Sequence, residues 1–375
     1  MIEFIHPTLM NYRLELFEKL HKKYNIKFIF VMHDPGKKFG GINIPSKWNS
    51  ENIYLSNFSL INWLRFVVRL LKDDYEIIIV GPAETPYSLV SFVISKLRSK
   101  KLIAWGEGWA WPEYSWYMKL YNKLVKIVLK RVDAIIATGK KPQEFYKNIL
   151  QKEEDIFYAN KYVVPFTKKD PIKLLEKLKQ KNLEIEGKKI ILFVGRIIKL
   201  KGVNYLIKAF KQLEEKLDDV YLLIVGDGPF KEECETLSKN LKIKKIMFTG
   251  YVSDEEILEL YYNLSYVLVL PSITLKGNAE ANGYVIYEFM GIGKPIVITD
   301  AVGAAPEYVQ DKVNGFVVQE KNVEKLYEAL FKILNNEKLA EEMGKKSKEI
   351  YTEKICLKKQ FDSFKRVIEY VKNKR

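Results

Sequence analysis

Cysteine and histidine are scarce in this chain of 375 residues. It contains two cysteines, Cys234 and Cys356, and three histidines. Two distant cysteines cannot form the disulfide framework of a small secreted domain, and so few Cys and His residues cannot supply the usual ligands of a zinc site. We therefore expect buried structural thiols, no bound metal or other cofactor, and a reducing, cytoplasmic environment.

Long apolar runs are also missing. No stretch of the sequence reaches the roughly 20 apolar residues that a membrane-spanning helix needs. The first residues, MIEFIHPTL, have neither the basic start nor the apolar core of a secretory signal. These absences predict a chain that is neither secreted nor held by a transmembrane helix.

Two glycine-rich phosphate-binding motifs are absent as well. The chain has no G-x-G-x-x-G between a strand and a helix, and no G-x-x-x-x-G-K-S/T. Because these motifs carry dinucleotide redox chemistry and P-loop chemistry, both function classes are disfavoured.

Short apolar runs alternate with helical patterns along the whole chain. This alternation is typical of parallel sheets joined by crossover helices, and the length suits two domains with separate cores. We expect an α/β protein with two sheets. The predicted strands of the first half are Ile2–Ile5, Ile26–Val31, Ile77–Val80, Leu102–Trp105 and Ala134–Ala137. Those of the second half are Ile190–Val194, Tyr221–Val225, Ile246–Thr249, Val267–Leu270, Ile296–Ile298 and Phe316–Val318.

A polar stretch, Tyr162–Glu186, separates the two sets of strands. We place the linker at Pro165–Pro171, so that the first domain comprises residues 1–165 and the second residues 166–357.

The segment E-A-N-G-Y-V-I-Y-E, from Glu280 to Glu288, follows a buried strand and a loop that begins at Pro271. Gly283 lets the backbone approach a ligand closely, and helical spacing begins at Tyr284. The unpaired amides of a helix N-terminus bind phosphate readily. The two carboxylates lie before and inside this helix, so one can contact a sugar and the other a ribose.

At these residues the chain resembles the family 4 retaining glycosyltransferases, whose E-x7-E motif has the same context. The resemblance extends over most of the C-terminal half, through ILFVGRIIKLKG (191–202), LLIVGDGP (222–229), FTGYV (248–252), GAAPE (303–307) and NGFVV (314–318). It implies the GT-B architecture, with two Rossmann-like domains facing across a cleft. It also implies that residues 358–375, including the helix candidate Phe361–Val371, return to the first domain.

The same resemblance implies roles for individual residues. Glu280 would contact the donor sugar and Glu288 the nucleotide ribose, with front-face attack retaining the anomeric configuration. The other substrate-binding candidates are Arg196, Lys201, Gly195, Asn282, Gly283, Tyr284, Val285 and Val252. The donor would be a nucleoside-diphosphate sugar, and the acceptor a glycan or lipid-linked molecule.

The position and charge of Arg196 and Lys201 also favour phosphate binding, independently of the resemblance. They follow the strand that ends at Val194, at the carboxyl edge where open α/β sheets bind ligands. A guanidinium and an ammonium together suit a diphosphate whose negative charge grows as it leaves. The alternative interpretation is a solvated basic turn.

Other interpretations of the acid pair remain open. Acids near a helix start can simply stabilise the helix, and two carboxylates can also form the catalytic pair of a retaining glycosidase. A nucleotide-sugar epimerase of the same fold and a non-catalytic nucleotide-binding protein are further alternatives.

The first half resembles the family less closely. His6–Arg13 lacks the glycine-rich loop that many relatives carry after the first strand. In G-E-G-W-A-W-P (106–112), Glu107 follows a strand and lies between two glycines. It is our first-domain candidate for a catalytic residue, in contact with the acceptor or the donor sugar; the alternative is a simple turn residue. His6 is a weaker candidate.

Positive charge is concentrated in the first half. Residues 1–165 hold 25 Lys and Arg against 16 Asp and Glu, within a chain of net charge +15. Two segments, Leu60–Lys72 and Trp109–Arg131, mix aromatic and apolar residues with repeated cations. Such helices can lie on an anionic membrane surface, although half-buried helices of an α/β domain are amphipathic too. The two interpretations of these segments are therefore a peripheral position at the inner face of the cell membrane and ordinary half-buried helices. No element that reads nucleic acid is visible in the sequence.

Overall fold

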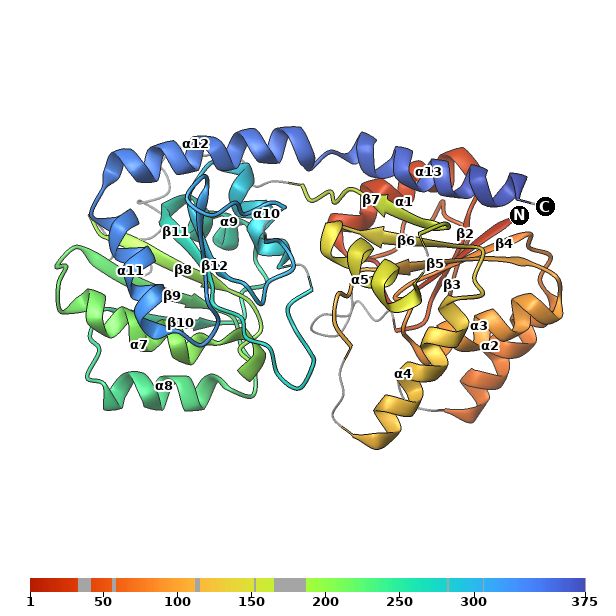
Figure 1. Ribbon diagram of the computed structural model, residues 1–375, viewed down its shortest axis with the longest axis horizontal. Helices are drawn as coiled ribbons and strands as arrows, with labels where there is room; N and C mark the ends of the chain where they lie inside the picture. Colours follow the sequence, from red (N-terminus) through yellow and green to blue (C-terminus); the bar gives the residue numbers. More distant parts are fainter. Residues whose placement is uncertain are drawn as a thin grey trace. The chain divides into compact units, whose positions relative to one another are not determined.

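The structure is a computed structural model that describes residues 1–32, 42–55, 59–111, 115–151, 153–164, 187–281, 283–305 and 307–374. The chain divides into two compact units (Figure 1). Unit 1 contains Met1–Val163 and Cys356–Arg375, and unit 2 contains Val164–Ile355. The linker expected at Pro165–Pro171 lies entirely outside the described residues.

Unit 1 is built on a seven-stranded sheet in the order β3-β2-β1-β4-β5-β6-β7. Every neighbouring pair is parallel. The strands are β1 (Ile2–His6), β2 (Lys27–Phe30), β3 (Ser50–Asn52), β4 (Ile77–Val80), β5 (Lys101–Gly106), β6 (Ala134–Thr138) and β7 (Ile156–Ala159). Because both faces are covered by helices, the central strands are apolar at nearly every position.

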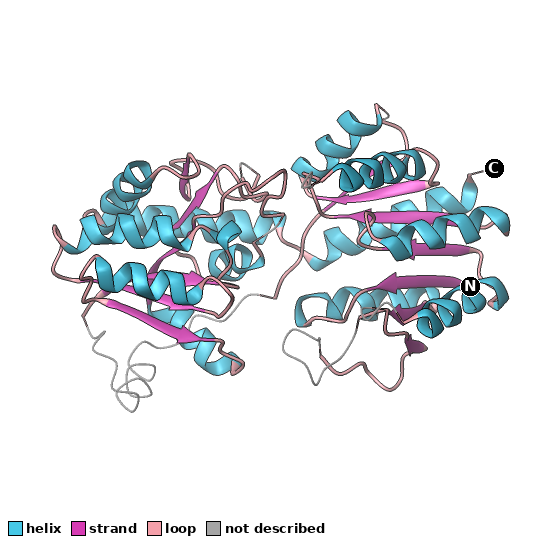
Figure 2. Ribbon diagram, turned by 90° about the horizontal axis from the view of Figure 1, so that it is seen from below, coloured by secondary structure: helices cyan, strands magenta, loops and turns pink. Residues whose placement is uncertain are grey.

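Helices cover the two faces of this sheet in different sets. Alternate strand residues point to opposite faces, so Ile5 belongs to a core cluster with residues of α2, α3, α4 and α5, while Phe4 belongs to a second cluster with residues of α1 and α13. Figure 2 shows the helices layered over the strands in each unit. The helices are α1 (Asn11–Tyr24), α2 (Leu60–Lys72), α3 (Pro86–Leu97), α4 (Trp116–Leu129), α5 (Lys140–Leu150) and α13 (Leu357–Asn373).

Unit 2 has a six-stranded parallel sheet in the order β10-β9-β8-β11-β12-β13. Its strands are β8 (Lys189–Val194), β9 (Val220–Val225), β10 (Ile246–Gly250), β11 (Ser265–Leu270), β12 (Ile296–Thr299) and β13 (Gly315–Val318). Its helices are η1 (Lys199–Lys201), α7 (Val203–Glu214), α8 (Lys231–Asn240), α9 (Glu255–Leu264), α10 (Tyr284–Gly291), α11 (Val323–Leu334) and α12 (Glu337–Lys354).

All eleven strands predicted from the sequence are confirmed, with ends that shift by at most two residues. The sequence did not predict β3 and β7, which are the two edge strands of the unit 1 sheet. β3 has only three residues, Ser-Glu-Asn. An edge strand needs no continuous apolar run, so its sequence carries little signal.

The sequence predicted buried thiols without a disulfide and no membrane-spanning helix. Cys234 is buried on α8, and Cys356 is half-buried directly before α13; both are free thiols. Among the described residues, none of the helices combines the length and the apolar character that crossing a bilayer requires.

Candidate functional site

The carboxyl edge of the unit 2 sheet brings two predicted site residues into direct contact. The Lys201 ammonium donates a hydrogen bond to Oε2 of Glu280 and forms an ion pair with it. Both side chains are largely enclosed, with exposed fractions of 16% and 13%. A charge that is mostly removed from water needs such a partner.

The backbone around Lys201 is held against the end of a neighbouring strand. Gly202 has a φ of 63°, and a Cβ at this position would lie 2.0 Å from the carbonyl oxygen of Pro271. Only glycine permits both the left-handed backbone and this close approach. The loop after β8 therefore lies directly beside the loop after β11.

Glu280 is fixed from two directions. Its Oε1 accepts a hydrogen bond from the backbone N–H of Gly283 at 3.0 Å, and its carbonyl oxygen accepts one from the N–H of Gly303 at 2.9 Å. Gly283 has a φ of 60°, and a Cβ there would lie 2.6 Å from a Leu270 methyl group. The glycine thus lets α10 start close to the end of β11, with its first amides at the carboxyl edge.

Glu288 lies within α10, and its carboxylate accepts a hydrogen bond from the Tyr262 hydroxyl at 2.6 Å. Burial raises the pKa of Glu288, the Tyr262 hydroxyl lowers it, and the nearby Glu255 carboxylate raises it further. Tyr262 was not predicted as a site residue. It lies on α9, where the spacing makes it a core position, and only its hydroxyl distinguishes it from the apolar residues around it.

The other predicted residues of unit 2 lie at the same edge. Gly195 and exposed Arg196 follow β8, and Val252 follows β10. Tyr284 and Val285 form the first turn of α10, whereas Asn282 lies outside the described residues. The structure thus joins Lys201 and Gly283 through Glu280, and it places Gly195, Arg196, Tyr284, Val285 and Val252 at the same edge of the sheet.

At the carboxyl edge of the unit 1 sheet, Glu107 is paired with a cation. The Arg13 guanidinium donates to Oε2 of Glu107 at 2.9 Å, and it also lies 4.3 Å from the centre of the Trp105 ring. Arg13 comes from α1 and Glu107 from the residue after β5, so two distant parts of the sequence meet here. Sequence reasoning found Glu107 but not its partner Arg13.

His6, at the end of β1, is part of the packing beneath this pair. Its Nδ1 donates a hydrogen bond to the carbonyl oxygen of Thr8 at 2.8 Å, and its ring packs against Phe17 and Trp105. Burial lowers the pKa of His6 well below its usual range, and the Arg13 cation lowers it further. The imidazole is therefore neutral and serves mainly as a packing group.

A second carboxyl group near Glu107 was missed by sequence reasoning. Glu84 follows β4, and its Oε1 accepts a hydrogen bond from the Tyr146 hydroxyl. Its backbone carbonyl oxygen accepts another from Tyr121 at 2.8 Å. Burial raises the pKa of Glu84 to about 7, and the Glu107 carboxylate adds to the increase. In the sequence Glu84 stands alone in a G-P-A-E-T-P turn, so no motif marks it.

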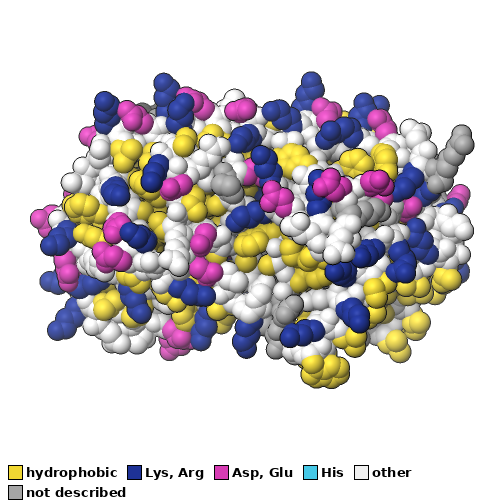
Figure 3. Space-filling model, viewed as in Figure 1, with side chains coloured by type: hydrophobic (Ala, Val, Ile, Leu, Met, Phe, Trp, Pro, Cys, Tyr) yellow, Lys and Arg dark blue, Asp and Glu magenta, His cyan; other side chains and the backbone are white. Residues whose placement is uncertain are grey.

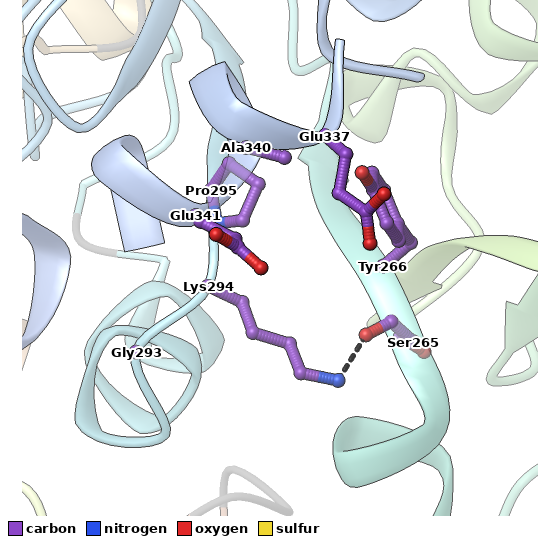
Figure 4. A pocket seen from close by; sticks show the side chains of 8 residues that line it. All are labelled: Ser265, Tyr266, Gly293, Lys294, Pro295, Glu337, Ala340 and Glu341. Carbon is purple, nitrogen blue, oxygen red and sulfur yellow. Dashed lines mark hydrogen bonds between the residues drawn. The ribbon is translucent and has the colours of Figure 1, made fainter. Parts of the chain in front are cut away.

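Unit 2 also has a pocket at the opposite, amino edge of its sheet (Figure 4). It is lined by Ser265, Tyr266, Lys294, Pro295, Glu337 and Glu341, among others. The Lys294 ammonium donates to the carbonyl oxygens of Asn263 and Ser265 and so ties down the start of β11. Because Lys294 is already used by the backbone and two acids flank the pocket, it is poorly suited to a phosphate.

The known proteins that this chain resembles in sequence are glycosyltransferases. Residues 175–350 match the family model described as Glycosyl transferases group 1. An uncharacterized glycosyltransferase of Methanocaldococcus jannaschii is 27% identical over 97% of this chain and 91% of its own. A GDP-mannose-dependent alpha-(1-6)-phosphatidylinositol monomannoside mannosyltransferase of Mycobacterium tuberculosis is 27% identical over 46% of this chain and 45% of its own.

Among solved structures, the fold matches the crystal structure of Anabaena HepE in complex with UDP and glucose. The TM-score is 0.77 with 18% identity, over 98% of this chain and 99% of that chain. The two parallel-sheet α/β units therefore have the GT-B fold predicted from the sequence.

Proposed function

We propose that this chain, whose residues 175–350 match the group 1 glycosyl transferases, is a retaining glycosyltransferase. It moves a sugar from a nucleoside-diphosphate sugar to a glycan or a lipid-linked acceptor. Unit 2 binds the donor, and unit 1 supplies contacts to the acceptor. The observation that carries the proposal is the contact between Lys201 and Glu280 beside the N-terminus of α10.

This arrangement suits a donor whose diphosphate is the leaving group. Negative charge builds up on the diphosphate as the bond to the sugar breaks, and a fixed ammonium, a guanidinium and helix amides stabilise that charge. Lys201, Arg196 and the first turn of α10 provide these three kinds of group. With two protein cations at this edge, we expect transfer to need no metal ion and no cofactor.

The ion pair also suggests how the donor is recognised. A diphosphate can take over the Lys201 ammonium from Glu280, and the released carboxylate can then accept hydrogen bonds from sugar hydroxyls. In this proposal Glu288, which accepts a hydrogen bond from Tyr262, also accepts one from a ribose hydroxyl. One carboxylate thus serves the reacting sugar and the other the nucleotide.

In the transfer step, the bond between the sugar C1 and the diphosphate oxygen breaks while a bond forms from an acceptor oxygen to C1 on the same face. The acceptor proton passes to the departing diphosphate oxygen. Configuration at C1 is retained, and no covalent sugar–enzyme intermediate forms. Glu107 in unit 1 contacts the acceptor in this proposal.

A panel of nucleotide sugars tests the proposal. Release of nucleoside diphosphate is measured with and without a membrane lipid extract, and the anomeric configuration of the product is read by NMR. A retained anomer that depends on acceptor supports the proposal. Inverted product, or donor binding without turnover on any acceptor, contradicts it.

A nucleotide-sugar epimerase is the second candidate, because two carboxyl groups, Glu84 and Glu107, approach each other in unit 1. Paired acids can remove and return a proton. The same panel separates the two functions, since an epimerase converts one nucleotide sugar into another without any acceptor.

A further inference from the structure

The outer surfaces of three unit 1 helices are apolar. Eighteen large hydrophobic side chains are exposed in the part of the chain that the structure describes, and twelve of them lie on α2, α3 and α4. We call these twelve the outer apolar face. They are Leu60, Ile61, Leu64, Val68, Leu71, Val93, Leu97, Trp116, Tyr117, Leu120, Leu124 and Ile127. In Figure 3, hydrophobic side chains gather along the lower edge of unit 1, where Figure 1 shows α2 and α4.

On α2 and α4 this face is a second apolar stripe, separate from the one that packs on the sheet. Ile61, Leu64, Val68 and Leu71 recur every three or four residues, and Tyr117, Leu120, Leu124 and Ile127 repeat the same spacing on α4. Residues so spaced share one side of a helix. The buried apolar residues of α4, by contrast, are Val125 and Leu129.

Helix α3 buries three serines beside Tyr87 and Ile94 and leaves apolar residues exposed. It buries Ser88, Ser91 and Ser95, and it exposes Leu97, whose exposed fraction is 76%. The hydroxyls of Ser91 and Ser95 donate to backbone oxygens of their own helix at 2.7 and 2.8 Å, so the buried serines are satisfied. Since α2 packs on α3 and α3 on α4, the three outer surfaces are continuous.

The charge on these helices has one sign. Together α2, α3 and α4 contain seven Lys and Arg and no Asp or Glu. Helix α12 of unit 2, by contrast, is mixed in charge, with acids at Glu337, Glu341, Glu342, Glu349 and Glu353. Apolar side chains with flanking cations and no acids are the composition of helices that lie in an anionic membrane interface.

We propose that the outer apolar face docks unit 1 on an anionic lipid bilayer, with its apolar side chains in the interface and its lysines at the head groups. Apolar side chains grouped on one surface are unfavourable in water, and a large patch of them marks an interaction site. A second copy of the chain is a poorer occupant, because pairing two such faces would bring like charges together. Glu107, at the carboxyl edge of the unit 1 sheet, and Trp116, on the outer apolar face, are only nine residues apart in the sequence. A role of this face in reaching a lipid acceptor rests on the proposed function, whereas docking itself does not.

Sedimentation with vesicles tests the docking without any catalysis. We expect binding to phosphatidylcholine vesicles that contain about 30% phosphatidylglycerol, and much weaker binding to pure phosphatidylcholine. Replacing Lys119, Lys123 and Lys126 with Gln should weaken binding about a hundredfold at low salt, since each lysine near the surface contributes roughly fivefold. The double variant Leu120→Asp/Leu124→Asp should weaken it at least tenfold at about 50 mM and at about 500 mM salt, because salt screens charge attraction but not apolar insertion.

Matched controls come from unit 2. The triple change of Lys208, Lys338 and Lys345 to Gln removes the same charge from exposed sites, and Val313→Asp places an acid at another exposed apolar residue. Neither should change vesicle binding by more than about twofold, within the spread expected for surface changes. Trp116→Phe supplies a local probe. Quenching of tryptophan fluorescence by brominated lipid should be smaller in this variant than in the wild type.

Three outcomes would overturn the proposal. The first is that the wild type does not bind phosphatidylglycerol vesicles at low salt. The second is that the control lysine variant loses as much binding as the α4 lysine variant. The third is that the protein does not bind vesicles and sedimentation velocity shows a dimer, which the Leu120→Asp/Leu124→Asp change dissociates. Failure of the glycosyltransferase proposal looks different, because vesicle binding would persist while no nucleotide sugar is consumed.

Discussion

The carboxyl edges of the two sheets carry opposite kinds of charged group. In unit 2, Lys201 and exposed Arg196 accompany Glu280 and the start of a helix. In unit 1, two carboxyl groups, Glu84 and Glu107, lie with the Arg13 cation and with aromatic rings. The same parallel-sheet scaffold therefore carries cations that suit a phosphate in one unit, and hydrogen-bond acceptors that suit hydroxyl groups in the other.

The charges at each edge determine which ligand groups that unit can bind. Carboxylates accept hydrogen bonds from sugar hydroxyls but repel phosphate oxygens, whereas cations and helix amides attract them. A diphosphate bound in unit 1 would face two acids. The contrast therefore supports assigning the donor to unit 2 and an uncharged, hydroxyl-bearing part of the acceptor to unit 1.

The largest expected effect comes from Glu280→Gln, which tests whether unit 2 holds the reacting sugar. Gln keeps the size of the side chain but loses the charge that pairs with Lys201, so turnover should fall at least about a hundredfold while donor affinity changes far less. Steady-state kinetics and calorimetry with donor separate the two. Equal and small changes in both would mean that Glu280 only starts the helix.

Lys201→Ala should show the next largest effect, on binding of the free nucleoside diphosphate. Loss of a charge-assisted hydrogen bond costs about 1.5–3 kcal/mol, which corresponds to roughly a tenfold to hundredfold weaker affinity. Lys199→Ala is the matched control, because Lys199 belongs to the same short helix but is exposed. If both variants bind the diphosphate as the wild type does, the cation site lies elsewhere.

The parts of the molecule that the sequence predicted share a property: each depends on local pattern. The central strands show as apolar runs because both of their faces are buried, and Lys201 and Glu280 occur within motifs of fixed spacing. Tyr262 and Arg13 act through partners that are far away in the sequence, Glu288 and Glu107. No local pattern records such a contact, because the topology of the fold creates it.

The orientation of helix α3 could not be predicted from the sequence either. Its sequence, PYSLVSFVISKL, is apolar enough to suggest a core helix, and spacing alone does not tell which side faces the sheet. The serines that would normally mark a solvent side are the buried ones. The basic aromatic segments on α2 and α4 were evident from composition, but their outward direction and the participation of α3 required the structure.

Glu288→Gln should have an intermediate effect, mainly on nucleoside binding. The amide loses the charge that strengthens a hydrogen bond from ribose, so we expect the affinity for the nucleoside diphosphate to fall by about tenfold and turnover at saturating donor to change little. Tyr262→Phe removes the hydroxyl that holds the carboxylate and should give a smaller loss in the same direction. A turnover defect as deep as that of Glu280→Gln would contradict the division of roles between the two acids.

The smallest expected effect concerns Glu84 and the stability of unit 1. Its pKa is raised from 4.5 to about 7, so between these values the folded chain keeps a proton that the unfolded chain has lost. Stability therefore falls as the pH rises through this interval and levels off above about 7. Glu84→Gln cannot ionise, so its unfolding free energy should fall less between pH 5 and 7, by on the order of 1 kcal/mol.

Urea unfolding followed by tryptophan fluorescence measures this effect in unit 1 alone, because all six tryptophans, from Trp48 to Trp116, lie in that unit. Glu3, whose pKa burial also raises to about 7, contributes with the same sign, so part of the pH dependence should remain in the variant. Glu144→Gln removes an exposed carboxylate from α5 and should leave the wild-type dependence unchanged. If Glu84→Gln and Glu144→Gln behave alike, Glu84 is ionised in the folded chain, and the carboxyl edge of unit 1 carries two negative charges rather than one.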